Sequence, residues 1–104
     1  MQLPSEFKCA GNTIKVQLVE KTYNNNYGNW CDVTNTITIA KTIELEDKTV
    51  VNLTEDQITN TFWHELIHCF QFYFDNSYSE AQSQVYANFL CEYFKSVASY
   101  DEFG

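Results

Sequence analysis

Both histidines of the chain lie within five consecutive residues, His64-Glu65-Leu66-Ile67-His68. Side chains four residues apart on an α-helix project from the same face, so the two imidazoles can bind one metal ion. The glutamate after the first histidine is then placed to take a proton from a water molecule that the metal activates. This HExxH pattern predicts a Zn²⁺ site with His64 and His68 as ligands and Glu65 as general base. The alternative is a helix that carries two surface histidines without a metal.

The composition describes one small globular domain, residues 1–104. The chain is 44% hydrophobic and 16% aromatic, which favours a folded core over disorder. Its net charge is −8 with only six Lys and Arg residues, and this argues against nucleic acid as a main partner because phosphates require basic side chains. The sequence has neither a secretory signal pattern nor an apolar run long enough to span a membrane. We therefore expect a cytoplasmic protein with no membrane partner.

The four cysteines, Cys9, Cys31, Cys69 and Cys91, form no CxxC pair. In a reducing compartment such residues are more often small buried side chains than disulfides, so we expect free thiols. Cys69 follows His68 directly, but on a helix it points about 100° away from that histidine. A cysteine ligand for the metal is therefore not expected.

The first half of the chain has the pattern of a small sheet. Residues 13–20 and 34–40 alternate between apolar and polar side chains and are expected to be strands. Two weaker segments, residues 7–9 and 27–32, are expected to be short strands, the first of them at an edge. Gly11-Asn12 is expected to form a turn, and Asp47-Lys48 to interrupt the next segment as a loop. The prediction is an antiparallel or mixed sheet of about three strands within residues 7–50.

The second half of the chain has the pattern of two helices. A capping box at Thr54 predicts a helix from about residue 55 to 74, and another at Ser79 predicts a helix from about residue 80 to 99. Apolar stripes cover most of the first helix, so its HExxH face is expected to lie in a cleft. The short connection implies that the helices pack against each other. The predicted fold class is α+β, with the sheet packed on two C-terminal helices.

A catalytic zinc needs a third protein ligand and an open position for water. The chain has no third histidine, so a carboxylate from the second helix is the natural candidate. Glu80 and Glu92 compete for this role, and they lie about 120° apart around the helix. Glu80 shares its stripe with mostly small residues, which would let the helices approach closely. Glu92 is flanked by Tyr93. If Glu92 is not a metal ligand, it is a solvated charge on the surface.

The second helix also resembles a known family. Residues 80–90, EAQSQVYANFL, resemble the ExxA[ND]xFAxxL signature of the ImmA/IrrE-type metallopeptidases, and are closer still to short HExxH proteins of phages and mobile elements. In those proteins a strand-rich half with a Tyr-Gly segment, here Tyr27-Gly28, precedes the HExxH helix and a glutamate-led helix. The resemblance covers about residues 7–97, and only its HExxH part is specific. The chain departs from the pattern at Ser83, Gln84 and Cys69.

The resemblance implies a minimal zincin-like metallopeptidase of the gluzincin type. It implies that His64, His68 and Glu80 bind Zn²⁺ and that Glu65 is the base in the hydrolysis of a peptide or protein substrate. It also implies that the strand at residues 34–40 lies along the cleft and pairs with the substrate backbone.

Two supporting roles stay open in the sequence. The oxyanion donor could be Tyr27, Tyr73 or Tyr86, although core packing is the more common use of a tyrosine. Asp75 follows His68 by seven residues and could orient its ring, but a solvated acid at a helix end is the alternative.

Two further functions are compatible with the same residues. One is a non-catalytic zinc-binding accessory or regulatory protein of a phage or mobile element, which the small size of the chain favours. The other is a toxin-like or regulator-cleaving component that shares the chemistry and differs in its target. A closed four-ligand site would favour the accessory protein, and an open position with water would favour the peptidase.

Overall fold

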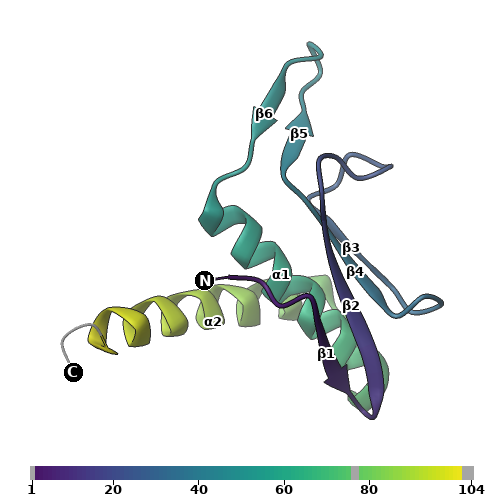
Figure 1. Cartoon of the computed structure of the whole chain (residues 1–104), viewed down its shortest axis with the longest axis vertical. Helices are drawn as coiled ribbons and strands as arrows, with labels where there is room; N and C mark the ends of the chain where they lie inside the picture. Colours follow the sequence, from purple (N-terminus) through teal and green to yellow (C-terminus); the bar gives the residue numbers. More distant parts are fainter. Residues whose placement is uncertain (1, 76–77, 102–104) are drawn as a thin grey trace.

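The computed structural model describes residues 2–75 and 78–101, without the side chains of residues 75 and 98–101. The strands are β1 (Glu6–Cys9), β2 (Asn12–Val19), β3 (Gly28–Cys31), β4 (Thr36–Ala40), β5 (Thr42–Glu44) and β6 (Val50–Asn52). The helices are α1 (Glu55–Phe70), which continues as the π-helix η1 (Gln71–Asp75), and α2 (Glu80–Asp101). Strands followed by helices confirm the predicted α+β class (Figure 1).

The main sheet is mixed and has four strands in the order β1-β2-β4-β3, one more than predicted. Both weak segments of the sequence pair in it, as β1 and β3. β3 and β4 form a hairpin, and its second strand pairs in parallel with β2. The β1–β2 turn consists of Ala10 and Gly11, with φ of 50° and 80°, rather than Gly11-Asn12. A two-residue turn of this kind needs positive φ at both positions, which glycine supplies without strain.

The segment predicted as a loop around Asp47-Lys48 is the tip of a second, two-stranded sheet. β5 and β6 pair in antiparallel register, and Lys48 has a positive φ of 71° at the tip. The hairpin stands away from the rest of the molecule (Figure 1), and all three residues of β6 are exposed. The polar residues therefore form a turn between strands instead of ending the sheet region.

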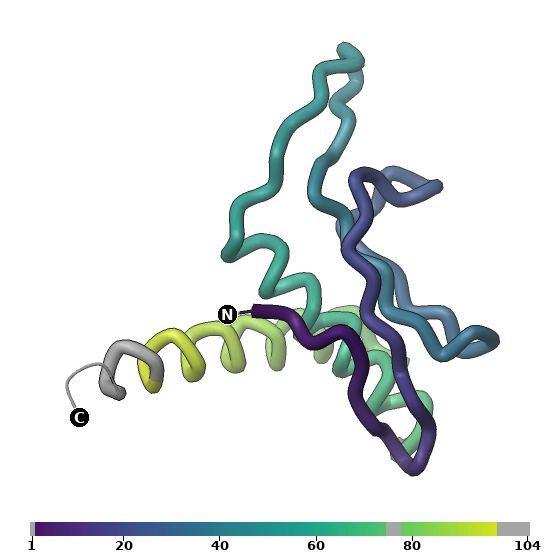
Figure 2. The backbone as a smooth tube through the Cα atoms, in the orientation of Figure 1, coloured from purple at the N-terminus to yellow at the C-terminus, as the bar shows by residue number. Residues whose placement is uncertain are grey.

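Helix α1 lies between the main sheet and α2, and contacts both (Figure 2). The predicted capping box is complete at its start: the Gln57 N–H donates to Thr54 Oγ1 at 3.1 Å, and the Thr54 N–H donates to Gln57 Oε1 at 2.8 Å. The core where the three layers meet consists of Ile14, Ile37, Ile39, Phe62, Trp63, Cys69 and Ala87. This packing fixes the face of α1 that carries the HExxH residues.

The four cysteines are free thiols in this structure. Cys69 is buried beside Cys9, and burial is the main cause that raises the pKa of its thiol to about 12. Among the described residues, no helix combines the length and apolar character that a bilayer crossing requires.

Candidate metal centre

Three predicted ligands converge at the groove between α1 and α2. His64 and His68 come from successive turns of α1, and Glu80 is the first residue of α2. The two histidine Nε2 atoms are 3.0 Å apart. Glu80 Oε1 lies 2.6 Å from His68 Nε2, and Glu80 Oε2 lies 3.2 Å from His64 Nε2. One ligand atom from each of the three residues therefore falls within 4.8 Å of the others.

The size of this triangle can be compared with a tetrahedral zinc site. Metal–ligand distances of about 2.0–2.1 Å place the ligand atoms of such a site about 3.3–3.4 Å from one another. The observed separations of 2.6–3.2 Å are shorter by less than about 1 Å, so a small outward movement makes room for the ion. The Glu80 side chain is 63% exposed and can make this movement. Two imidazoles and one carboxylate are also a donor set that catalytic zinc uses.

His64 is oriented by an amide network on the surface of the groove. Its Nδ1 lies 3.0 Å from Gln84 Oε1. The amide nitrogen of Gln84 donates to the side-chain oxygens of Asn60 and Asn88, each at 2.9 Å. Because the amide nitrogen is used in this way, the oxygen of Gln84 faces the ring and accepts the Nδ1 hydrogen.

His68 is oriented by a second amide, which is buried. Its Nδ1 lies 3.1 Å from Gln71 Oε1 and 3.2 Å from Ser83 Oγ. Gln71 is 1% exposed, and its amide nitrogen donates to Gln82 Oε1 at 2.9 Å. The Asp75 side chain, proposed for this orienting role from the sequence, lies outside the described part of the structure.

These contacts decide which ring nitrogens carry hydrogen. With amide oxygens as acceptors at both Nδ1 atoms, both rings keep their lone pair on Nε2. Two lone pairs at 3.0 Å, beside a carboxylate, repel each other unless a positive charge lies among them. A positive charge among these atoms, from a proton or from a metal ion, removes this repulsion, and the three residues could hold a metal ion.

Glu65 is buried one residue beyond His64, with only 8% of its surface exposed. Burial is the main cause that raises its pKa to about 7, His64 opposes the rise, and Glu80 adds to it. A Cβ atom on Gly28 would lie 2.5 Å from Thr61 Cγ2 and 3.4 Å from Glu65 Cγ. Glycine at this position therefore allows β3 to approach the face of α1 that carries Thr61 and Glu65.

A cleft of about 710 Å³, here called the metal cleft, opens beside these residues. Its lining includes Tyr27, Gly28, Thr61, His64, Glu65, Glu80 and Gln84. The cleft is therefore bordered by Glu65 of α1 and by Gly28 at the start of β3.

Tyr78 belongs to the site although the sequence reasoning missed it. Its ring stacks on His68 with centroids 4.3 Å apart and planes at 6°, and its hydroxyl donates to Glu80 Oε1 at 2.5 Å. The bond to Glu80 is the main cause that raises the pKa of Tyr78 to about 12. The residue lies in the connection before α2, where no periodic pattern could have indicated its direction.

The other sequence candidates lie in different places. Tyr27 lines the metal cleft. The hydroxyl of Tyr73 donates to Asn35, and Tyr86 is 46% exposed and does not line the cleft. Glu92, the competing third ligand, lines a different cavity and is not among the clustered ligand atoms. Only Glu80 of the two glutamates is therefore placed beside the histidines.

The prediction that the strand at residues 34–40 pairs with the substrate is wrong, because of the topology of the sheet. β4, within residues 34–40, is paired on both sides, by β2 and by β3. The edge strand of the sheet beside the metal cleft is β3. The Ala40 N–H donates to the Tyr27 carbonyl, so by antiparallel alternation Gly28 and Trp30 direct their N–H and C=O groups to the outer edge. The available backbone groups are therefore those of β3.

The chain was compared with protein families, curated proteins and solved structures. No protein-family model, no curated protein and no solved structure matches the chain. The interpretation of the site therefore depends on its residues and their geometry.

Proposed function

We propose that the protein is a zinc-dependent metallopeptidase in which His64, His68 and Glu80 bind Zn²⁺ and Glu65 is the general base. One observation carries the proposal: two Nε2 lone pairs and a carboxylate converge on one point while both Nδ1 atoms are held by amide oxygens. A pair of surface histidines would need neither the matched orientation nor the buried partner of His68.

The chemistry is divided between the ion and the chain. When bound, Zn²⁺ lowers the pKa of a water molecule and polarises the substrate carbonyl. The Glu65 carboxylate takes a proton from the attacking water and passes it to the leaving nitrogen. A base and acid that acts in both steps works best when its pKa is near the working pH. Burial raises the pKa of Glu65 to about 7 in the metal-free chain, and a cation bound beside it favours the carboxylate form that accepts the proton.

The chain also offers groups that position an extended substrate. Gly28 and Trp30 present backbone donors and acceptors along the open edge of β3, so a peptide can add to the sheet as a further strand. Tyr78 fits the role of oxyanion donor better than the tyrosines considered from the sequence, because its hydroxyl already contacts Glu80. Its raised pKa of about 12 keeps that hydroxyl protonated at neutral pH.

The test measures zinc content and peptide cleavage on the same purified variants. We expect about one zinc per chain, lost in His64→Ala and in Glu80→Ala. Glu65→Gln should keep the zinc and lose cleavage. Unchanged cleavage by Glu65→Gln would remove the general-base role, and full zinc content in Glu80→Ala would move the third ligand elsewhere.

A second candidate is a non-catalytic zinc-binding accessory protein. One observation favours it: Glu80 reaches one histidine with each of its two oxygens, and a bidentate carboxylate could close the fourth position. Cobalt-substituted protein separates the two functions. A change in its visible spectrum on addition of acetohydroxamate indicates an open position and the peptidase, whereas an unchanged spectrum indicates a closed site.

A further inference from the structure

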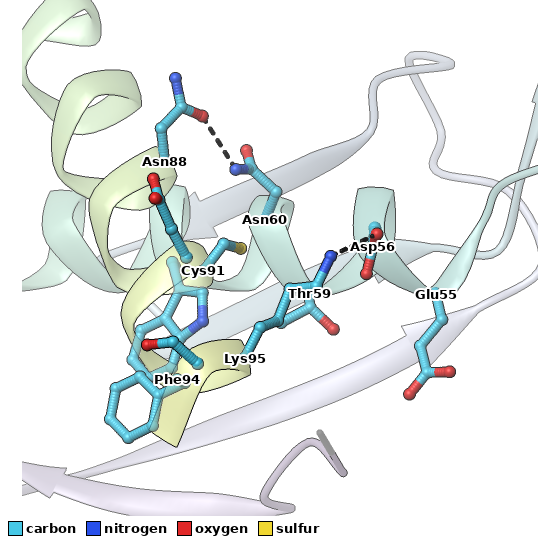
Figure 3. A pocket seen from close by; sticks show the side chains of 11 residues that line it. Glu55, Asp56, Thr59, Asn60, Asn88, Cys91, Phe94 and Lys95 are labelled. Carbon is cyan, nitrogen blue, oxygen red and sulfur yellow. Dashed lines mark hydrogen bonds and ion pairs between the residues drawn. The ribbon is translucent and has the colours of Figure 1, made fainter. Parts of the chain in front are cut away.

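A second cavity, of about 770 Å³, lies next to the metal cleft between the first half of α1 and the second half of α2 (Figure 3). We call it the α1–α2 pocket, and its lining includes Asp56, Asn60, Trp63, Glu92, Phe94 and Lys95. Asp56 and Asn60 line both cavities. The two cavities are therefore neighbours that share part of the α1 wall, and the amide hydrogen bonds from Asn60 to Gln84 and Asn88 lie where they meet.

The wall of the α1–α2 pocket is aromatic and contains an unused hydrogen-bond donor. Trp63 and Phe94 stack with centroids 5.0 Å apart and planes at 10°. Phe94 remains 41% exposed, while Trp63 is only 9% exposed. Trp63 Nε1 is buried and has no hydrogen-bond partner in the described part of the chain. Buried donors are normally paired, so this one indicates an acceptor that a ligand supplies.

The rim of the pocket is acidic. Two acidic side chains, Asp56 and Glu92, and one lysine, Lys95, line it. Lys95 pairs with Asp56 at 2.9 Å across the groove (Figure 3). No ion pair involves Glu92 among the described residues, so its charge is available to a ligand. The pocket thus combines an aromatic wall with an excess of negative charge.

We propose that the α1–α2 pocket binds a lysine or arginine side chain of the peptide substrate. The aliphatic stem of such a side chain lies on the exposed ring of Phe94, and its cationic end pairs with Glu92. A backbone carbonyl of the same peptide becomes the acceptor for Trp63 Nε1 once the side chains that cover this atom move aside. This inference names the substrate class of the peptidase proposed above and rests on that function.

The helix geometry places the basic residue relative to the cleaved bond. Along α1, the pocket residues Thr59 and Asp56 precede His64 by five and eight positions, or about 7.5 and 12 Å at 1.5 Å per residue. An extended peptide advances about 3.3 Å per residue. The basic side chain is therefore expected about two to four residues from the bond that is cleaved.

The first arm of the test measures cleavage specificity. Zinc-loaded protein is incubated with a proteome-derived peptide library, and the best substrate is compared with a copy in which the basic residue is norleucine. Norleucine keeps the stem and removes the charge. We expect kcat/KM to fall about three- to fivefold, the magnitude of one partly exposed ion pair. Glu92→Gln should cause the same loss on the basic peptide and none on the norleucine peptide.

The matched control is Glu46→Gln, which removes the same charge from the exposed loop between β5 and β6, outside both cavities. It should leave the preference for the basic peptide intact. Asn60 is unsuitable as a test position because it also holds Gln84, the partner of His64. No preference for a basic residue at these positions, or an equal loss in Glu46→Gln, would overturn the proposal.

The second arm measures binding without cleavage. Fluorescein-labelled Gly-Ala-Ala-Lys-Ala-Ala-Gly and its norleucine copy are titrated with zinc-loaded Glu65→Gln, with and without Glu92→Gln. Tighter binding of the lysine peptide that disappears with Glu92→Gln supports the subsite even if the wild type cleaves nothing, in which case only the peptidase function fails. Equal binding of the two peptides overturns the subsite even if cleavage is observed.

Discussion

Replacing Glu65 by glutamine in the metal-free protein should increase stability at alkaline pH and leave it nearly unchanged in acid. Glu65 is 8% exposed, and burial raises its pKa in the folded protein to about 7, against an ordinary value of 4.5. Below pH 4.5 the carboxyl is protonated in both the folded and the unfolded chain, so its burial costs no charge. As the pH rises from 4.5 to about 7, the unfolded chain ionises first and the folded protein loses stability.

The size of this effect follows from the two pKa values. At 1.36 kcal/mol for each pH unit, a difference of about 2.5 between them corresponds to about 3 kcal/mol at pH 8 and less than about 1 kcal/mol at pH 5. Glutamine has nearly the same shape and no charge, so Glu65→Gln should be more stable than the wild type by these amounts.

The measurement is urea unfolding in EDTA at several pH values between 5 and 8, on the wild type, Glu65→Gln and the exposed control Glu46→Gln. The free-energy difference for Glu65→Gln should grow with pH through this window, while that for Glu46→Gln should stay within about 0.5 kcal/mol of zero. A difference for Glu65→Gln that does not change with pH would mean that the carboxylate is solvated in the folded protein. Burial would then not be the cause that sets the pKa of Glu65.

Three further substitutions test the surroundings of the site. Gly28→Ala places a Cβ 2.5 Å from Thr61 Cγ2, so the free energy of unfolding, measured by thermal unfolding, should fall by about 1–3 kcal/mol. Cleavage should also fall. An unchanged melting temperature would contradict this contact. Gln71→Leu removes the acceptor for His68 Nδ1 and should weaken zinc binding about 10- to 100-fold in competition with a fluorescent chelator; equal affinity would show that the buried amide does not orient the ring. Tyr78→Phe keeps the ring stacked on His68, so zinc content and KM should hold while kcat falls about 100-fold, and an unchanged kcat would exclude the hydroxyl as oxyanion donor.

The elements that the sequence predicts well are those with local signals. The capping box at Thr54 predicts the start of α1 correctly, whereas helical periodicity predicts its end at about residue 74. The α-helix ends at residue 70, and the chain continues as a π-helix over Gln71–Asp75. Ser79 was expected to form a second reciprocal box with Gln82. Its hydroxyl does accept the Gln82 N–H at 3.1 Å, but its own N–H points to Gln71 Oε1 at 3.4 Å instead. The difference arises because Gln71 holds the Gln82 side chain, a contact across eleven residues.

The sheet order could not be predicted in the same way. Alternation in residues 34–40 indicates which side chains of β4 face the core, but it does not name the neighbouring strands. The position of β4 between β2 and β3 is decided by which pairings bury Ile37 and Ile39, both fully buried. These pairings join segments that are distant in the sequence. They make β3, and not β4, the edge strand whose backbone groups are available. Tyr78 could not be predicted as a site residue for the same reason, because the direction of its side chain depends on its stacking with His68.

The neutral partners of the two histidines have a consequence for the base. Both rings are held by amide oxygens, from Gln84 and Gln71, where a carboxylate could make the same hydrogen bond. Glu80 already raises the pKa of Glu65, which is about 7. A further negative charge at Gln71 or Gln84 would raise that pKa more and keep Glu65 protonated at neutral pH, where it must accept a proton. In the proposed peptidase, amides would therefore orient the metal ligands without raising the pKa of Glu65 further, so Gln84→Glu should shift the pH optimum of cleavage upward while Gln84→Asn should not.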